Sequence, residues 1–141
     1  MTLYTSDEKK RVLRYCMLDV AATVFIALFG GIYEYFSHDV YSYFMMYAFA
    51  VPLVLGVLPM VVMLKRGRHI PSAFSMLIYH AGLAALTVGS VFQGVLEIYG
   101  TTNRLIAIYP IVGLTLSAIG ASELLRDARP EPAKLHAQPN K

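Results

Sequence analysis

The strongest constraint on the fold is a set of four long apolar stretches, at residues 15–33, 41–64, 70–96 and 105–125. A helix of about 20 apolar residues crosses a bilayer core about 30 Å thick, so each stretch is long enough for one span. Lipid offers the backbone no hydrogen-bond partner, whereas a helix satisfies its own backbone groups. Short connections favour antiparallel neighbours. The sequence therefore predicts an all-α integral membrane protein, whose four transmembrane helices form an up-down antiparallel bundle.

Composition agrees with a membrane protein. Only 15% of the 141 residues are charged and 57% are hydrophobic, whereas soluble domains carry about 25% charged residues. The first apolar stretch is too long for a secretory signal, whose apolar region spans roughly 7–15 residues, so we expect it to be retained. The sequence pI of about 9.0 does not indicate a nucleic-acid partner, because the basic residues flank the apolar stretches. The lone Cys16 excludes an internal disulfide and a cysteine-only metal site.

The distribution of lysine and arginine predicts the orientation of the spans. Residues 1–14 contain four basic residues, the connection between the second and third spans contains three, and residues 126–141 contain four. These eleven of the twelve basic residues fall on one side of a four-span chain, and only Arg104 falls on the other. We therefore expect a cytoplasmic segment at 1–14, a membrane domain at 15–125 and a disordered cytoplasmic tail at 126–141. Such a chain fits the plasma membrane of a bacterium.

Small residues and prolines mark the faces on which the helices are expected to pack. Gly113, Ser117 and Gly120 form one stripe on the fourth span, and small residues allow close helix contact in lipid. The third span carries Gly82 and Gly89 on one side and His80, Ala84, Thr87 and Gly94 roughly opposite. It is therefore either the central helix or a helix that also contacts another subunit.

The second span contains two prolines on one face, Pro52 and Pro59. Each lacks the backbone donor that would bond the carbonyl four residues earlier, on Ala48 and Leu55. We interpret the prolines as kinks whose freed carbonyls are satisfied by neighbouring groups. The alternative is a polar lining for a solute or ion path.

Two groups of polar residues are candidate sites, because ionisable residues within a membrane suggest function. The inner group is Asp19 and His80, with Gln93 further along the third span. Asp19 and His80 could pair and relay protons or bind a polar ligand. Alternatively, Asp19 pairs with Arg14 or reaches the interface, and His80 makes one hydrogen bond to a neighbouring helix.

The outer group lies on the aromatic side of the predicted membrane domain. It could bind a divalent cation or admit protons, or it could be an interfacial network in which Arg104 pairs with Glu97 or Glu34. If the first helix continued far enough, Glu34 and His38 would share a face. The members of the group are Glu34, His38, Asp39, Glu97, Asn103 and Arg104.

The chain contains no phosphate loop, G-x-S-x-G, H-E-x-x-H or C-x-x-C motif, so a soluble-type catalytic apparatus is not expected. No cofactor or metal site is predicted. Haem or a divalent cation stays a minor alternative, since His38 and His80 differ too much in depth to clamp one haem within a monomer.

Three functions fit this pattern. The first is an accessory or structural subunit of a membrane complex. The second is a small oligomeric solute or proton-coupled transporter, and the third is a redox or quinone-site anchor that uses a histidine. The expected partners are lipid and either further copies of the chain or another membrane subunit.

Overall fold

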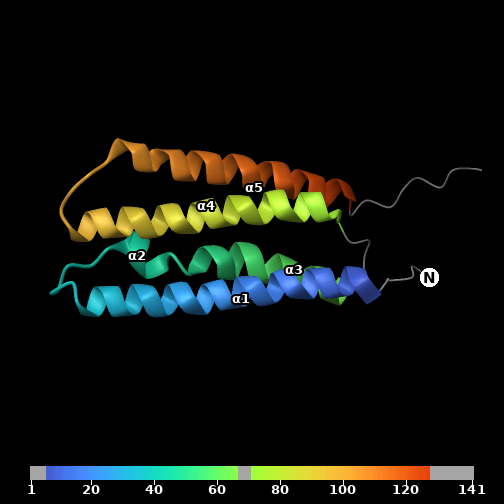
Figure 1. The fold of residues 1–141 in the computed structure, drawn as a ribbon, viewed down its shortest axis with the longest axis horizontal. Helices are drawn as coiled ribbons and strands as arrows, with labels where there is room; N and C mark the ends of the chain where they lie inside the picture. Colours follow the sequence, from blue (N-terminus) through green and yellow to red (C-terminus); the bar gives the residue numbers. More distant parts are fainter. Residues whose placement is uncertain (1–5, 67–70, 128–141) are drawn as a thin grey trace, which may run out of the picture.

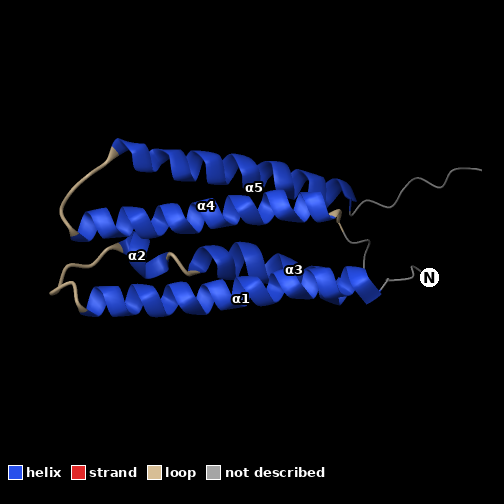
Figure 2. Ribbon diagram, viewed as in Figure 1, coloured by secondary structure: helices blue, strands red, loops and turns tan. Residues whose placement is uncertain are grey.

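The computed structural model describes residues 6–66 and 71–127, and within these ranges the chain is helical and contains no strand. The helices are labelled in Figure 1 and coloured as a class in Figure 2. Their order along the chain is α1 (Ser6–Tyr35), α2 (Tyr43–Tyr47), the π-helix η1 (Val51–Val57), α3 (Leu58–Arg66), α4 (Ala73–Ile98), the 3₁₀-helix η2 (Arg104–Ala107) and α5 (Ile108–Asp127).

Four helical stretches are long and apolar enough to cross a membrane: Ser6–Tyr35, Tyr43–Lys65, Ala73–Ile98 and Arg104–Arg126. Even 23 residues, the shortest of these lengths, extend about 34 Å as a helix, more than the hydrocarbon thickness of about 30 Å. The prediction of an all-helical chain with four apolar, membrane-length helices is confirmed. The tail proposed at 126–141 lies outside the described residues from 128 onward.

The helices run alternately in opposite directions, and α4 lies between α5 and the pair formed by α1 and α3 (Figure 1). α4 packs against α5 on one side and against α2 and η1 on the other. α1 packs against α2, η1 and α3. α4 is therefore the central helix, and this position explains why it needs small or polar residues on two sides.

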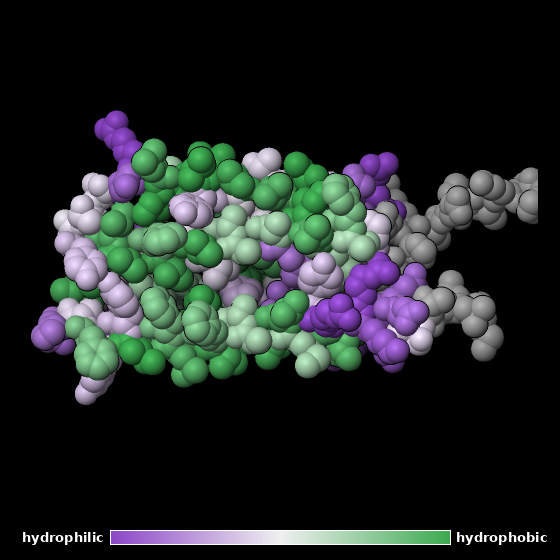
Figure 3. Space-filling view, viewed as in Figure 1, coloured by the Kyte–Doolittle hydropathy of each residue, from purple (hydrophilic) through white to green (hydrophobic). Residues whose placement is uncertain are grey.

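The two ends of the molecule differ in chemistry (Figure 3). We call one the basic end; its basic residues include Lys9, Lys10, Arg11, Arg14, Lys65 and Arg126. We call the other the aromatic end; its rings are those of Tyr33, Tyr35, Phe36, Tyr41, Tyr43, Phe44, Tyr99 and Tyr109. Between them, apolar side chains dominate the visible surface. Exposed apolar side chains such as Phe25 and Ile111, 66% and 65% exposed, are suited to a lipid surrounding.

The second apolar stretch is not one continuous α-helix. α2 ends at Tyr47, and η1 follows with the wider hydrogen-bond spacing of a π-helix, in which Leu58 N–H donates to Leu53 O. Pro52 lies in the first turn of η1, where a missing N–H is tolerated. The carbonyl of Ala48 accepts from Val51 N–H at 3.4 Å. Pro52 thus lies within the π-helical segment, whereas Pro59 is the second residue of α3, directly after it.

The contact between α4 and α5 is built on glycines. A Cβ on Gly89 would lie 2.5 Å from Cβ of Tyr109, and one on Gly120 would lie 2.5 Å from the backbone nitrogen of Tyr79. Gly82 lies against Ser117, and Gly113 lies against Leu86. Side chains at these positions would push the helices apart, so the small residues permit the close approach that stabilises helices in lipid.

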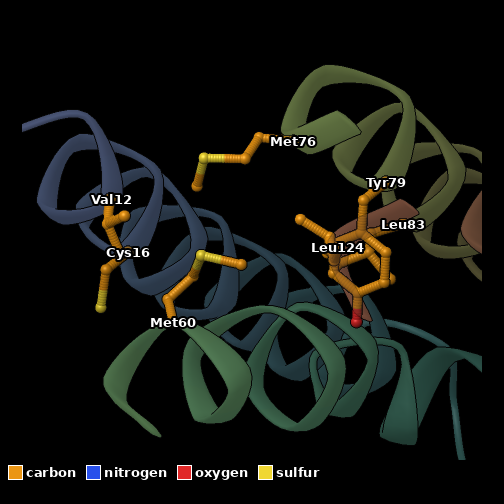
Figure 4. Close-up of a cluster of buried hydrophobic side chains, with 7 residues drawn as sticks. All are labelled: Val12, Cys16, Met60, Met76, Tyr79, Leu83 and Leu124. Carbon is orange, nitrogen blue, oxygen red and sulfur yellow. The ribbon is translucent and has the colours of Figure 1, made fainter. Parts of the chain in front are cut away.

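A cluster of buried side chains lies near the basic end, where α1, α3, α4 and α5 meet (Figure 4). Val12, Met60 and Met76 are 0% exposed. The other members are Cys16, Tyr79, Leu83 and Leu124. Flexible methionine side chains suit such an irregular junction between helices.

Candidate functional site

The inner polar residues, Asp19 of α1 and His80 of α4, form a direct pair. Nε2 of His80 lies 3.0 Å from Oδ2 of Asp19. The side chain of His80 is only 12% exposed, and that of Asp19 is only 10% exposed. A buried pair of this kind satisfies groups that would be costly to leave alone in an apolar surrounding. Asp19 therefore faces the bundle interior rather than the basic end.

Gly56 of η1 makes room for the carboxylate. A Cβ at this position would lie 2.6 Å from Cγ of Asp19 and 2.8 Å from Oδ2. Any side chain there would displace the carboxylate. The π-helical turn between Pro52 and Pro59 places Gly56 at this position, in keeping with the frequent occurrence of π-turns at functional sites.

Two tyrosines enclose the imidazole of His80. The ring of Tyr15 lies 4.4 Å from it, centroid to centroid, at an interplanar angle of 31°. The ring of Tyr79 lies 5.5 Å away and nearly perpendicular, at 85°. The hydroxyl of Tyr79 donates a 2.6 Å hydrogen bond to the carbonyl oxygen of Leu55, which is one of the carbonyls that a proline deprives of its helical donor.

The hydrogen bonds of His80 determine how many protons the pair holds. Nδ1 lies 2.8 Å from the carbonyl oxygen of Met76. A carbonyl oxygen can only accept, so Nδ1 carries a proton. The contact between Nε2 and Asp19 then needs a second proton, either on the imidazole or on the carboxylic acid. With two protons the pair is electrically neutral, and loss of one leaves a charge of −1.

The pair lies at one end of a half-open groove between α1 and α4, with a volume of about 390 Å³. Both Asp19 and His80 line it, and Pro52 of η1 also contributes. The remaining walls are mainly apolar: Leu18, Ala22, Phe25, Ile26, Leu83, Ala84, Thr87 and Val88. The hydroxyl of Thr87 donates to Leu83 O, which leaves the pair as the main polar feature of the groove.

The buried cluster blocks the direct route from the pair to the basic end. Cys16, Met60 and Met76 belong to it, and each lies one helical turn closer to that end than Asp19, Gly56 and His80, respectively. The groove, by contrast, opens sideways between α1 and α4. A ligand therefore reaches the pair more readily from the side of the molecule than through its basic end.

The outer group does not assemble into one site. Glu34 and His38 would share a face only if the first helix continued to His38, and this condition is not met, because α1 ends at Tyr35. Ser37 N–H and its hydroxyl both donate to Glu34 O. His38 and Asp39 then adopt left-handed backbone conformations, with φ of 54° and 67°. Glu34 and His38 consequently do not share a helix face.

Glu97 joins α4 to α2. One of its carboxylate oxygens accepts a 2.6 Å hydrogen bond from Ser42, and the other accepts from Gln93 at 3.3 Å. The Ser42 hydroxyl oxygen also accepts from Met45 N–H at the start of α2. These bonds give Glu97 and Gln93 a structural role, which the sequence analysis missed because it did not single out Ser42.

The remaining outer residues lie apart from this network. Asn103 caps η2 by accepting from Leu105 N–H at 2.9 Å, and Arg104 forms no ion pair within the described ranges. Oε1 of Glu34 is buried and has no hydrogen-bond partner among the described residues. In residues 6–66 and 71–127, no three His, Cys, Asp or Glu side chains converge as metal ligands.

Sequence reasoning named Asp19, His80 and Pro52, and it placed Gly56 on the face of the second span that carries the prolines. It did not assign Gly56, Tyr15 or Tyr79 to the site. The proline at 59 carried a usable signal for Tyr79, because the freed carbonyl of Leu55 required a donor from another helix. Comparison of the chain with protein-family models, curated proteins and solved structures yields no match. Function is therefore argued from the geometry of the pair and its groove.

Proposed function

We propose that the chain is a multi-pass membrane protein that couples solute movement to proton binding at Asp19 and His80. One observation carries this proposal: a buried pair that can hold one or two protons lies in a groove of ligand size. Ligand pockets span about 300–1,000 Å³, and the groove volume of about 390 Å³ falls in this range. A proton relay or a coupled solute site is the usual use of such groups within a membrane.

The proposed orientation places the basic end and both termini in the cytoplasm of a bacterial cell. It rests on the eleven basic residues assigned to that side, since cytoplasmic loops carry the excess of lysine and arginine. In this orientation His80 lies about 10 Å along α4 from Ala73, at 1.5 Å per residue. The pair would then lie in the cytoplasmic half of the bilayer.

An accessory-subunit role is the second candidate, and the packing of α5 favours it. Among the long helices, α5 packs mainly against α4, and Ile111, Leu114 and Leu125 are more than 60% exposed. Lipid, a second copy or another subunit could cover this face. Stoichiometric co-purification of another membrane protein in mild detergent would support this role.

A quinone-binding role has less support from the geometry. A quinone carbonyl would need a free donor, but both nitrogens of His80 already face oxygen atoms. The groove therefore presents an acceptor, the Asp19 carboxylate, rather than a donor.

The transport proposal is tested in proteoliposomes by recording solute-driven proton flux with an entrapped pH-sensitive dye, which also detects exchange that moves no net charge. Organic ammonium ions, amino acids, organic anions and neutral sugars are supplied in turn under a proton gradient. We expect at least one class to drive a proton flux that Asp19→Asn and His80→Ala abolish. Glu123→Gln is the matched control, because this carboxylate lies on an exposed face and pairs, among the described residues, with neighbouring Arg126. A proton flux that is absent for every class, or unchanged in Asp19→Asn, would overturn the proposal.

A further inference from the structure

We infer that the groove binds a lipophilic ammonium ion bearing an N–H group, and that this ion displaces one proton from the Asp19–His80 pair. The inference rests on the proposed function and names its substrate class. It follows from which polar atoms in the groove have partners, from the charge of the pair and from the apolar walls.

The first step concerns the unpartnered atom. Both nitrogens of His80 are engaged, with Met76 O and with Oδ2 of Asp19. The hydroxyl of Thr87 donates to its own helix. Oδ1 of Asp19 receives no hydrogen bond from the described residues, although Asp19 lines the groove. A ligand that bonds here must donate, so the site selects against groups that can only accept.

The second step concerns charge. When the pair loses one proton, His80 keeps the proton on Nδ1 and Asp19 is a carboxylate, so the groove carries a charge of −1. A cation restores neutrality, as the displaced proton did. The exchange balances: the ammonium ion binds to the carboxylate, the second proton leaves to solvent, and no covalent bond to carbon changes. The pair that has lost a proton would repel an anion, and burial in low dielectric strengthens this repulsion.

The third step concerns the apolar part of the ligand. Phe25, Ile26, Leu83 and Val88 line the walls, and burial of apolar surface adds about 25 cal/mol per Å². Because the cluster around Met60 and Met76 blocks the basic end, the ligand would enter sideways between α1 and α4. A small, hydrated ammonium ion without an apolar part would gain little from these walls.

Other titratable groups around His80 bear on this exchange. Tyr15 of α1 and Tyr79 of α4 contact the imidazole. Cys16 lies one turn before Asp19 on α1 and is buried in the apolar cluster. η1 contributes Pro52 and Gly56, neither of which titrates. Asp19 is therefore the one carboxylate among the described residues that line the groove.

The test uses the purified full-length protein and four naphthyl probes of similar size. They are (naphthylmethyl)dimethylammonium, its trimethylammonium analogue without N–H, neutral naphthylmethanol and anionic naphthylacetate. Binding is measured by isothermal titration calorimetry in two buffers of different ionisation enthalpy, which gives the number of protons released. We expect the dimethylammonium probe to bind with release of about one proton, and the trimethyl analogue to bind about tenfold more weakly.

Two variants make the result specific. Asp19→Asn should weaken binding of the dimethylammonium probe at least about tenfold and remove proton release, whereas Glu123→Gln should match the unchanged protein. Ala84→Phe fills the groove without removing either member of the pair, and it should also weaken binding. This second variant keeps the test valid if Asp19→Asn fails to fold. Equal binding to unchanged protein and Asp19→Asn, or tighter binding of naphthylacetate, would overturn the inference.

The two proposals fail in different ways. If sugars or organic anions drive an Asp19-dependent proton flux but the ammonium probe does not bind, the transport proposal stands and the ammonium inference is wrong. If the probe binds and releases a proton but no solute drives a proton flux, the site binds cations without transporting them.

Discussion

The phenolic oxygen of Tyr79 donates a 2.6 Å hydrogen bond to the carbonyl oxygen of Leu55. Pro59 cannot supply the N–H that would bond this carbonyl in a regular helix. The hydroxyl of Tyr79 thus supplies a hydrogen-bond donor to the backbone of η1. The centroid of its ring lies 5.5 Å from that of the His80 ring. The bond ties the π-helical segment to α4 directly beside the candidate site.

Tyr79→Phe should therefore lower the free energy of unfolding by about 1–3 kcal/mol, because it removes the side-chain donor of a part-buried carbonyl. The measurement is an unfolding titration in detergent or bicelles. In a Pro59→Ala background, residue 59 regains its N–H, and the cost of Tyr79→Phe should shrink. An equal cost in both backgrounds would show that the Leu55 bond is not the cause. Tyr109→Phe is a suitable control, since its hydroxyl has no hydrogen bond within the described ranges.

Gly56→Ala should disrupt the Asp19–His80 pair. The added methyl group would lie 2.6 Å from Cγ of Asp19, so the carboxylate must move, at a cost of about 1–3 kcal/mol for overpacking. We expect binding of the dimethylammonium probe to fall together with stability. Gly31→Ala is the matched control, because a Cβ there meets nothing within 4 Å. If both variants bound the probe equally well and were equally stable, Gly56 would not be the residue that makes room for the Asp19 carboxylate.

Asp19 and His80 should show strong energetic coupling in a double-mutant cycle. Removing either side chain leaves its partner buried and unpaired, whereas removing both avoids that penalty. The unfolding free energies of Asp19→Ala, His80→Ala and the double variant give the coupling. We expect roughly 1.5 kcal/mol or more, above the average of about 0.6 kcal/mol for hydrogen bonds in a membrane protein. Additivity within about 0.5 kcal/mol would argue against a paired site.

The orientation can be tested with single cysteines, because Cys16 is the only native one and is buried. In a Cys16→Ala background, cysteines replace Asp39 and Asn103 at the aromatic end and Lys9 and Arg126 at the basic end. An impermeant maleimide added to intact cells should label the first two and spare the others until the membrane is opened. Labelling of positions 9 and 126 in intact cells would reverse the proposed topology.

The sequence by itself determined the number of long apolar helices and the chemical difference between the two ends. Both follow from hydropathy and charge along the chain, and neither depends on how the helices rotate. It also identified Leu55 as a carbonyl in need of a donor, because the effect of Pro59 on the backbone is local. These properties hold for any arrangement of the four helices.

Only the tertiary structure decided which polar residues meet. Asp19 and His80 are 61 positions apart, and their contact depends on the rotation of α1 and α4 and on the space left by Gly56. The same applies to Ser42 and Glu97, which are 55 positions apart. Each residue advances a helix by about 100°, so a shift of one position in the packing of a helix moves its side chains to another face. Patterns along the chain cannot specify those rotations, whereas close packing of the four helices fixes them.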